Sequence, residues 1–105
     1  MPQIKLSRLA ELDLDEIDLQ TIEHFGFDQA KKLRETFQKT FGLLCDNPEI
    51  GRDRPDLSPP NARFRGWTVM NRFLIIYQPK DESLDIVRIV NASRELHAVL
   101  EEDME

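Results

Sequence analysis

The chain changes its hydrophobic pattern across a proline- and charge-rich stretch at residues 47–61, which reads N-P-E-I-G-R-D-R-P-D-L-S-P-P-N. Before this stretch, apolar residues recur every three or four positions, which is the spacing of an amphipathic helix. After it, short apolar runs alternate with turn residues, which is typical of strands. Proline lacks a backbone N–H and restricts its neighbour, so the stretch itself is expected to be a loop. Helices in one half and strands in the other predict an α+β fold.

Two helices are expected in the first half. The first begins after Ser7, a residue type whose side chain caps helix N-termini, and Gly26 ends it. The second begins at Phe27 and ends before the Asn47-Pro48 pair. Helices joined by so short a break form an antiparallel hairpin. Their stripes are Ala10, Leu14, Ile17, Thr21 and Phe25 in the first helix, and Phe27, Ala30, Leu33, Phe37, Phe41 and Leu44 in the second.

Three strands are expected in the second half, at residues 62–68, 72–78 and 84–90. Asn71 lies in the first connection, where its side chain tolerates a left-handed turn conformation. Consecutive strands joined by short turns pair in an antiparallel sheet, and a helical hairpin buries its apolar stripe against one face of such a sheet.

The ends of the chain add one element each to this order. Residues 3–6 alternate polar and apolar side chains, so they are expected to form a short strand in the same sheet. Ser93 is expected to cap a last short helix that reaches about residue 102. The chain is therefore predicted to be a single α+β domain over residues 1–105, with the order β-α-α-β-β-β-α and an antiparallel sheet of about four strands.

Composition excludes several classes of protein. The net charge of −6 argues against a protein that coats nucleic acid, and no sequence-specific nucleic-acid binding is expected. No apolar run approaches the roughly 18 residues of a membrane span. The single cysteine, Cys45, allows no internal disulfide and suits a reducing cytoplasm. The two histidines, His24 and His97, lack partners at ligand spacing, so neither a metal nor another cofactor is expected.

Arginine residues in the second half are the main candidates for function. Regular alternation of the last strand places Arg88 on one face with Leu84, Ile86 and Val90, where an unpaired charge is costly. Arg88 is therefore either the ion-pair partner of an acid in the first helix or a direct functional contact.

A second group of candidates lies at the start of the strand-patterned half. Arg63 and Arg65 are expected on the same strand face as Trp67, in a strip that is either solvated or a recognition patch.

Six segments, in this order and at these spacings, resemble the toxins of the RelE/ParE superfamily, nearer to ParE. They are S-x-x-A-x-x-D-L-D-E-I at 7–17, F-G-x-x-x-A at 25–30, N-P-x-x-G-R-x-R-P-D-L at 47–57, A-R-F at 62–64, R-F-L-I-I-Y at 72–77 and I-V-R-I-V-N-A-S-R at 86–94. The chain departs from the family pattern at Asn91, where members often carry histidine, and near Asn71, where they often carry glycine. It is also acidic, whereas many members are basic.

The resemblance implies the toxin of a type II toxin–antitoxin, or plasmid-stabilisation, module. ParE-like toxins inhibit DNA gyrase, and RelE-like relatives cut messenger RNA on the ribosome. In the RelE-like nucleases a C-terminal tyrosine is part of the working set, but position 100 holds leucine here and the only tyrosine, Tyr77, lies inside an expected strand. Arginine is a poor proton donor or acceptor near neutral pH. The sequence therefore favours a ParE-like toxin that binds gyrase and has no catalytic site of its own.

This hypothesis assigns two surfaces. The target is expected to contact Arg63, Arg65, Trp67 and Arg94. A cognate ParD-like antitoxin is expected to cover the apolar residues of the first helix outside its main stripe, namely Leu9, Leu12, Leu19 and Ile22. One alternative is a RelE-like ribosome-dependent endoribonuclease that uses Arg63, Arg88, Arg94 and His97, and a second is a detoxified relative that only binds antitoxin.

Overall fold

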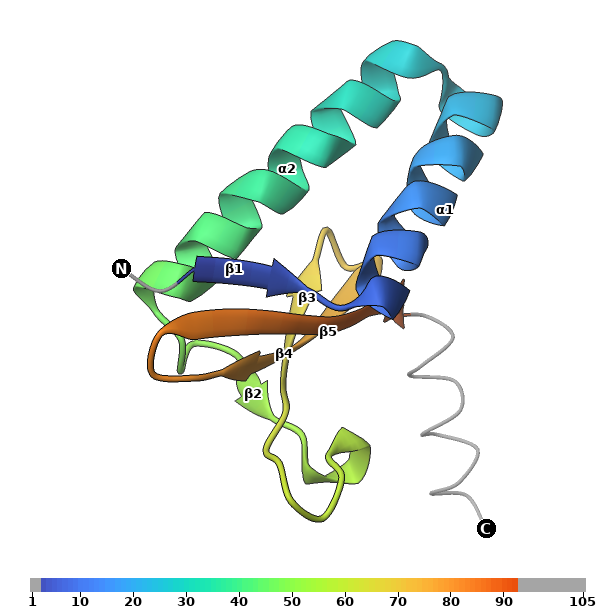
Figure 1. The fold of residues 1–105 in the computed structure, drawn as a ribbon. Coiled ribbons are helices and arrows are strands. Elements are labelled where there is room, and N and C mark those ends of the chain that lie inside the picture. Colours follow the sequence, from blue (N-terminus) through green and yellow to red (C-terminus); the bar gives the residue numbers. More distant parts are fainter. Residues whose placement is uncertain (1–2, 93–105) are drawn as a thin grey trace, which may run out of the picture.

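The computed structural model describes residues 3–92 and shows two helices on one face of a five-stranded sheet (Figure 1). No helix in this part of the chain has the length and apolar character needed to cross a membrane. The predicted last helix, residues 93–102, lies outside the described residues. The elements are β1 (Gln3–Leu6), α1 (Arg8–Phe25), α2 (Phe27–Asp46), β2 (Arg52–Asp53), the 3₁₀ turn η1 (Pro55–Leu57), β3 (Arg65–Val69), β4 (Phe73–Pro79) and β5 (Ser83–Asn91).

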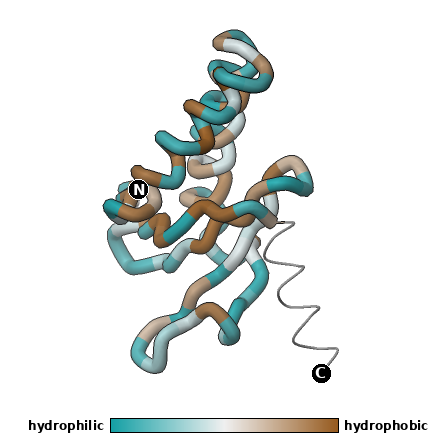
Figure 2. The backbone as a smooth tube through the Cα atoms, turned by 90° about the vertical axis from the view of Figure 1, so that its right-hand side faces the viewer, coloured by the Kyte–Doolittle hydropathy of each residue, from teal (hydrophilic) through white to brown (hydrophobic). Residues whose placement is uncertain are grey.

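Local sequence signals set both ends of α1 as expected. The Ser7 hydroxyl accepts a hydrogen bond from the Ala10 N–H at 3.0 Å, so it caps α1. Gly26 separates the helices with a φ of 89°, a left-handed conformation that glycine adopts without steric cost. Hydrophobic and hydrophilic residues alternate along the helical hairpin (Figure 2). The prediction of two helices that meet at Gly26 is confirmed.

The sheet has the strand order β1-β5-β4-β3-β2, which confirms the α+β class but corrects two details. β3, β4 and β5 are antiparallel as expected, whereas β1 is parallel to β5. A parallel pair requires a long connection, and the helices and strands between β1 and β5 supply it. The fifth strand, β2, comes from the proline-rich loop, where Arg52 and Asp53 pair with β3. Two residues suffice for this pairing, and the flanking Arg54 N–H extends it to the Phe64 carbonyl at 2.9 Å.

A register shift in the β4–β5 pair changes the expected facing of Arg88. Ile86 lies opposite Tyr77, but Arg88 lies opposite Ile76, so Val87 has no partner in the ladder. Such an extra residue moves the following side chains to the other face. Regular alternation predicts Arg88 on the same face as Leu84 and Ile86, and this prediction is wrong.

Two apolar clusters hold the sheet. The main core lies between the helices and the sheet, where Phe37 of α2 contacts Phe73 of β4 with ring centroids 5.5 Å apart. A smaller cluster lies on the other face, around Leu74 and Ile76. Because both faces of β4 are covered, its five residues from Phe73 to Tyr77 are all buried and show no polar–apolar alternation.

The turn between β3 and β4 contains two consecutive residues with left-handed backbone conformations, Met70 (φ 57°) and Asn71 (φ 52°). Asn71 was expected there, because its short polar side chain tolerates this conformation. Met70 was not expected, since a long side chain costs roughly 1 kcal/mol or more in this region. The Met70 side chain is also 58% exposed, so burial does not offset this cost.

Candidate partner-binding surfaces

Arg88 forms an ion pair with Asp13 of α1. Its Nε and Nη2 donate to the two carboxylate oxygens at 2.8 and 3.0 Å, and the Ile89 N–H donates to the same carboxylate at 3.0 Å. β1 pairs with β5 only as far as Ile86. Beyond that point no strand of the described residues lies beside this edge of β5, and the Asp13 carboxylate accepts the hydrogen bond of the Ile89 N–H instead. Of the two interpretations of Arg88, this geometry favours the structural ion pair.

The environment of Asp13 favours its charged form. Burial raises the pKa of this carboxyl, but the hydrogen bonds from Arg88 and Ile89 and the positive charge of Arg88 outweigh burial and bring the pKa below its ordinary value. The Asp13 side chain is only 13% exposed, so the carboxylate depends on these partners rather than on water.

Tyr77 fastens the proline-rich loop to the sheet and is fully buried. Its hydroxyl donates to the Pro48 carbonyl and accepts from the Gly51 N–H, both at 2.9 Å. Burial raises the pKa of Tyr77, and the Gly51 hydrogen bond and the nearby Arg65 charge offset it only in part. The hydroxyl therefore serves the fold, and Tyr77 is poorly suited to exchange protons with a substrate.

The expected target-binding residues have different surroundings. Arg65 donates through Nη1 to the carbonyls of Glu49 and Gly51, at 3.1 and 2.7 Å. Trp67 is half-buried and packs against the main core. Arg63 precedes β3 and is exposed. Arg94, like His97, lies outside the described residues, so the structure does not place these candidates relative to the others.

The outer side of α1 exposes leucines among acidic residues. Leu9, Leu12 and Leu19 are 55%, 53% and 61% exposed, whereas Ile22 is half-buried. α1 carries six Asp or Glu residues and one Arg, and only Asp13 and Asp18 among these acids form ion pairs within residues 3–92. Exposed leucines flanked by free carboxylates form a surface that suits a partner with apolar and basic side chains.

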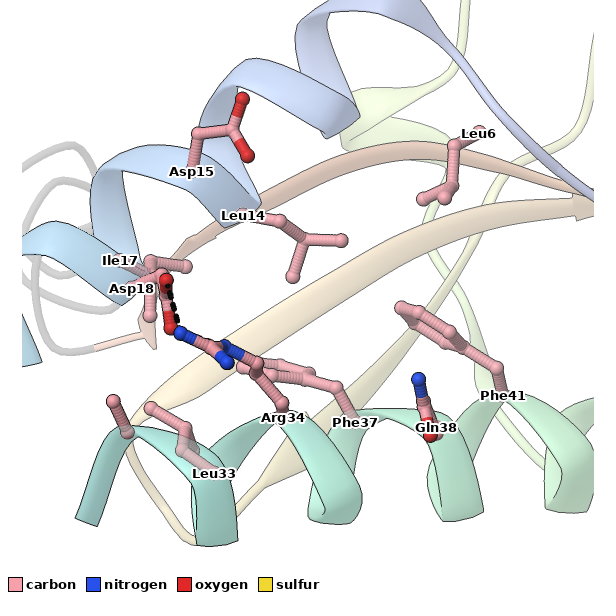
Figure 3. Close-up of a pocket in the computed structure, with 11 residues that line it drawn as sticks. Leu6, Leu14, Asp15, Ile17, Asp18, Leu33, Arg34, Phe37, Gln38 and Phe41 are labelled. Carbon is pink, nitrogen blue, oxygen red and sulfur yellow. Dashed lines mark hydrogen bonds and ion pairs between the residues drawn. The ribbon is translucent and has the colours of Figure 1, made fainter. Parts of the chain in front are cut away.

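A cavity of about 310 Å³ lies between α1, α2 and β1 (Figure 3). Leu14 of α1 and Phe37 and Phe41 of α2 point into the space between the helices. Asp18 accepts two hydrogen bonds from Arg34 at 2.6 and 2.7 Å, which link the two helices beside the cavity. The hydrogen bond from Arg34 lowers the pKa of the Asp18 carboxyl.

Sequence reasoning missed this cavity. The apolar stripes of the two helices were assigned entirely to the core, because periodicity identifies an apolar face but does not show how far two helices diverge.

Within residues 3–92 no group of three or more His, Cys, Asp or Glu side chains is arranged to hold a metal ion.

Comparisons with known proteins give one family match and several solved structures with a similar fold. Residues 4–96 match the family described as "ParE toxin of type II toxin-antitoxin system, parDE". The fold is similar to a chain of the chromosomal ParDE system of Pseudomonas aeruginosa, with TM-score 0.70, 25% identity and coverage of 87% of this chain and 96% of that one. No curated protein matches the sequence.

Two further solved structures share the fold. A chain of the Escherichia coli DinJ–YafQ complex has TM-score 0.58 and 18% identity, over 90% of this chain and 97% of that one. A metal-bound toxin from Helicobacter pylori has TM-score 0.59 and 24% identity, over 90% of this chain and 98% of that one. At these identities the likeness extends to the fold alone.

Proposed function

The chain belongs to the ParE toxin family of type II toxin–antitoxin systems, and from this premise we propose that it binds and inhibits DNA gyrase. In this proposal it has no catalytic site, acts in the cytoplasm and is neutralised by a cognate ParD-like antitoxin. We also propose a role in plasmid stabilisation.

One observation supports a mechanism by binding rather than catalysis: polar side chains that could serve catalysis already form hydrogen bonds within the fold. Cleavage of RNA without a metal requires a general base, a general acid and free cations at the phosphate. Arg88 is held by Asp13, and the Tyr77 hydroxyl is held by Pro48 and Gly51. Among the described members of the nuclease set, only Arg63 is exposed and free of such contacts, and an arginine alone cannot exchange protons.

A supercoiling assay with purified gyrase, beside a ribosome-dependent mRNA cleavage assay, tests this proposal. We expect the toxin to inhibit supercoiling and to leave mRNA intact, with antitoxin restoring supercoiling. Cleavage of mRNA without gyrase inhibition would establish the RelE-like alternative. Absence of both activities in a folded protein that binds antitoxin would establish the detoxified relative.

Two neighbouring features support an antitoxin site on the helical hairpin. The cavity between α1 and α2 offers apolar walls, and the exposed leucines of α1 extend this apolar character to the outside. The related Pseudomonas aeruginosa chain comes from a ParDE system, as its description states. We therefore assign Leu9, Leu12, Leu19 and Ile22 to antitoxin binding, with an amphipathic antitoxin segment that carries basic residues opposite the acids of α1.

Removing exposed leucines from α1 should weaken antitoxin binding without weakening the fold. Burial of a leucine side chain contributes about 1.5–3 kcal/mol, so Leu12→Ser and Leu19→Ser should each raise the antitoxin Kd about tenfold or more. Titration calorimetry measures this Kd. Gln20→Ser, an exposed change on the same helix, serves as the control and should leave the Kd unchanged. Leucine variants that bind as tightly as the control would remove α1 from the antitoxin site.

A further inference from the structure

The helical hairpin extends past the sheet (Figure 1). A small hollow is lined by residues of both its helices and by residues at the β3–β4 turn. The hollow has a volume of about 110 Å³. Its walls include Phe25 at the end of α1, Gln29, Lys32 and Thr36 on α2, and Met70 and Arg72 beside the turn. It shares Leu33 with the cavity between the helices, but its other lining residues are different.

Both charged residues that line this hollow are cations. The Arg72 guanidinium carbon lies 5.8 Å from the ring centre of Phe25 and 5.5 Å from that of Phe73, so two aromatic faces position it. Within residues 3–92 neither Lys32 nor Arg72 pairs with a carboxylate. Two unpaired cations beside one small hollow favour a negatively charged group there.

Exposed apolar side chains surround these cations. Phe25 is 61% exposed and Met70 is 58% exposed, and Phe27 at the same helix junction is 74% exposed. Met70 also has a left-handed backbone conformation, which residues other than glycine rarely adopt. An aromatic ring and a flexible methionine beside an arginine are the residue types favoured in protein interfaces.

The charge of this hollow is opposite to that of the outer side of α1. The acidic surface of α1 suits a basic partner segment, and the same segment would be repelled by Lys32 and Arg72. The two surfaces therefore suit different ligands, one basic and one acidic.

We propose that the hollow lined by Phe25, Lys32, Met70 and Arg72 docks an acidic segment of the toxin's target protein, with one apolar side chain placed in the hollow and a neighbouring carboxylate paired with Lys32 and Arg72. This assignment rests on the proposed function in so far as the segment belongs to the target rather than to the antitoxin. It places the target contact on residues other than Arg63, Arg65 and Trp67, none of which lines the hollow.

The chemistry of the hollow is tested directly on the full-length protein by two-dimensional NMR, with two synthetic probes. One is a hexapeptide of Glu and Asp residues around a central Leu-Phe pair, and the other has Lys in place of every acid. We expect the acidic peptide to shift the amide signals of Gln29, Thr36 and Met70 at millimolar concentration, and the basic peptide to leave them in place. Equal shifts with both peptides, or no shift with the acidic one, would overturn the proposal whatever gyrase does.

Charge reversal separates the hollow from its surroundings. Lys32→Glu should abolish the shifts caused by the acidic peptide, whereas Lys31→Glu should retain them, because Lys31 is the preceding, exposed residue of α2 but does not line the hollow. Both residues lie on the helix surface, so melting curves should match the unmodified toxin. A Lys32→Glu protein that still responds to the peptide would contradict the assignment.

The same two variants show whether the acidic segment belongs to the target protein or to the antitoxin. Lys32→Glu should raise the concentration for half-inhibition of gyrase at least tenfold and change the antitoxin Kd less than twofold, with Lys31→Glu unchanged in both assays. Loss of antitoxin binding instead would overturn the assignment to the target. If the unmodified toxin does not inhibit gyrase, the gyrase proposal fails, and loss of growth inhibition by Lys32→Glu then tests the target assignment. A toxin that inhibits neither gyrase nor growth has no target, and this assignment fails with it.

Discussion

Replacing Asp13 with alanine is expected to lower the free energy of unfolding by about 3 kcal/mol, because it breaks a partly buried ion pair and leaves a backbone donor unpaired. The carboxylate accepts hydrogen bonds from Arg88 and from the Ile89 N–H, and so links α1 to the edge of β5 beyond the end of β1. Urea unfolding followed by circular dichroism measures the change. The expected loss lies below the largest values for buried pairs, because the Arg88 side chain is 41% exposed and regains water.

Asp15→Ala is the matched control for this prediction. Asp15 lies on the same helix, is exposed and has no ion pair within residues 3–92, so its removal should change stability by less than about 0.5 kcal/mol. For the same reason Arg88→Ala should destabilise the protein more than Arg63→Ala, since Arg63 is exposed and lies outside the strands. Equal losses for Asp13 and Asp15, or equal melting shifts for the two arginine variants, would remove the ion pair from the account of stability.

The pH dependence of stability gives an independent reading of the same pair. The pKa of Asp13 is lowered in the folded protein, so its contribution is present above its unfolded pKa and is lost as pH falls through the lower, folded pKa. In Arg88→Ala, Asp13 is still partly buried but has lost the arginine that lowers its pKa. The pKa of Asp13 should therefore be higher than in the unmodified protein. The stability difference between the two proteins should therefore be largest at neutral pH and shrink below about pH 4.

Features that depend on a few neighbouring residues could be predicted from the sequence. Ser7 and Gly26 set the ends of α1 through their own backbone and side-chain chemistry, and Asn71 tolerates the left-handed turn for the same reason. The ion pair of Arg88 with an acid of the first helix was also one of two stated interpretations, because an arginine among apolar residues requires a partner. These inferences need no knowledge of the distant parts of the chain.

Features that depend on how distant segments meet could not be predicted. Alternation in residues 3–6 indicates a strand but not its direction, and β1 proved parallel to β5. The unpaired Val87 reverses the facing of Arg88, and no local pattern marks such an extra residue. The cavity between α1 and α2 and the hollow at Met70 depend on the angle between elements, which periodicity does not contain. Sequence reasoning therefore located the exposed leucines of α1 but neither hollow beside the helices.

Replacing Gly51 with alanine is the second change with a large expected effect. A methyl group at this position would lie 2.4 Å from the Tyr77 hydroxyl oxygen, 2.8 Å from its ring and 2.9 Å from the Gly66 carbonyl oxygen. Tyr77 is fully buried and its hydroxyl is bonded on both sides, and the Gly66 carbonyl is backbone, so no flexible group can move aside. We expect a loss of about 3 kcal/mol, at the upper end for overpacking a filled interior.

Gly42→Ala provides the opposite expectation within the same protein. Gly42 lies inside α2, and apart from its chain neighbours and the backbone of its own helix a methyl group there would meet no atom within 4 Å. Alanine has the higher helix propensity, so this change should stabilise the protein by about 0.5–1 kcal/mol. Thermal unfolding of both variants tests the pair, and hydrogen exchange at Ile50 and Gly51 shows whether the loss begins in the loop. If Gly51→Ala were as stable as the unmodified protein, residues 48–51 would have to leave Tyr77 without cost, and the Tyr77 hydrogen bonds would not be needed to hold this part of the loop against the sheet.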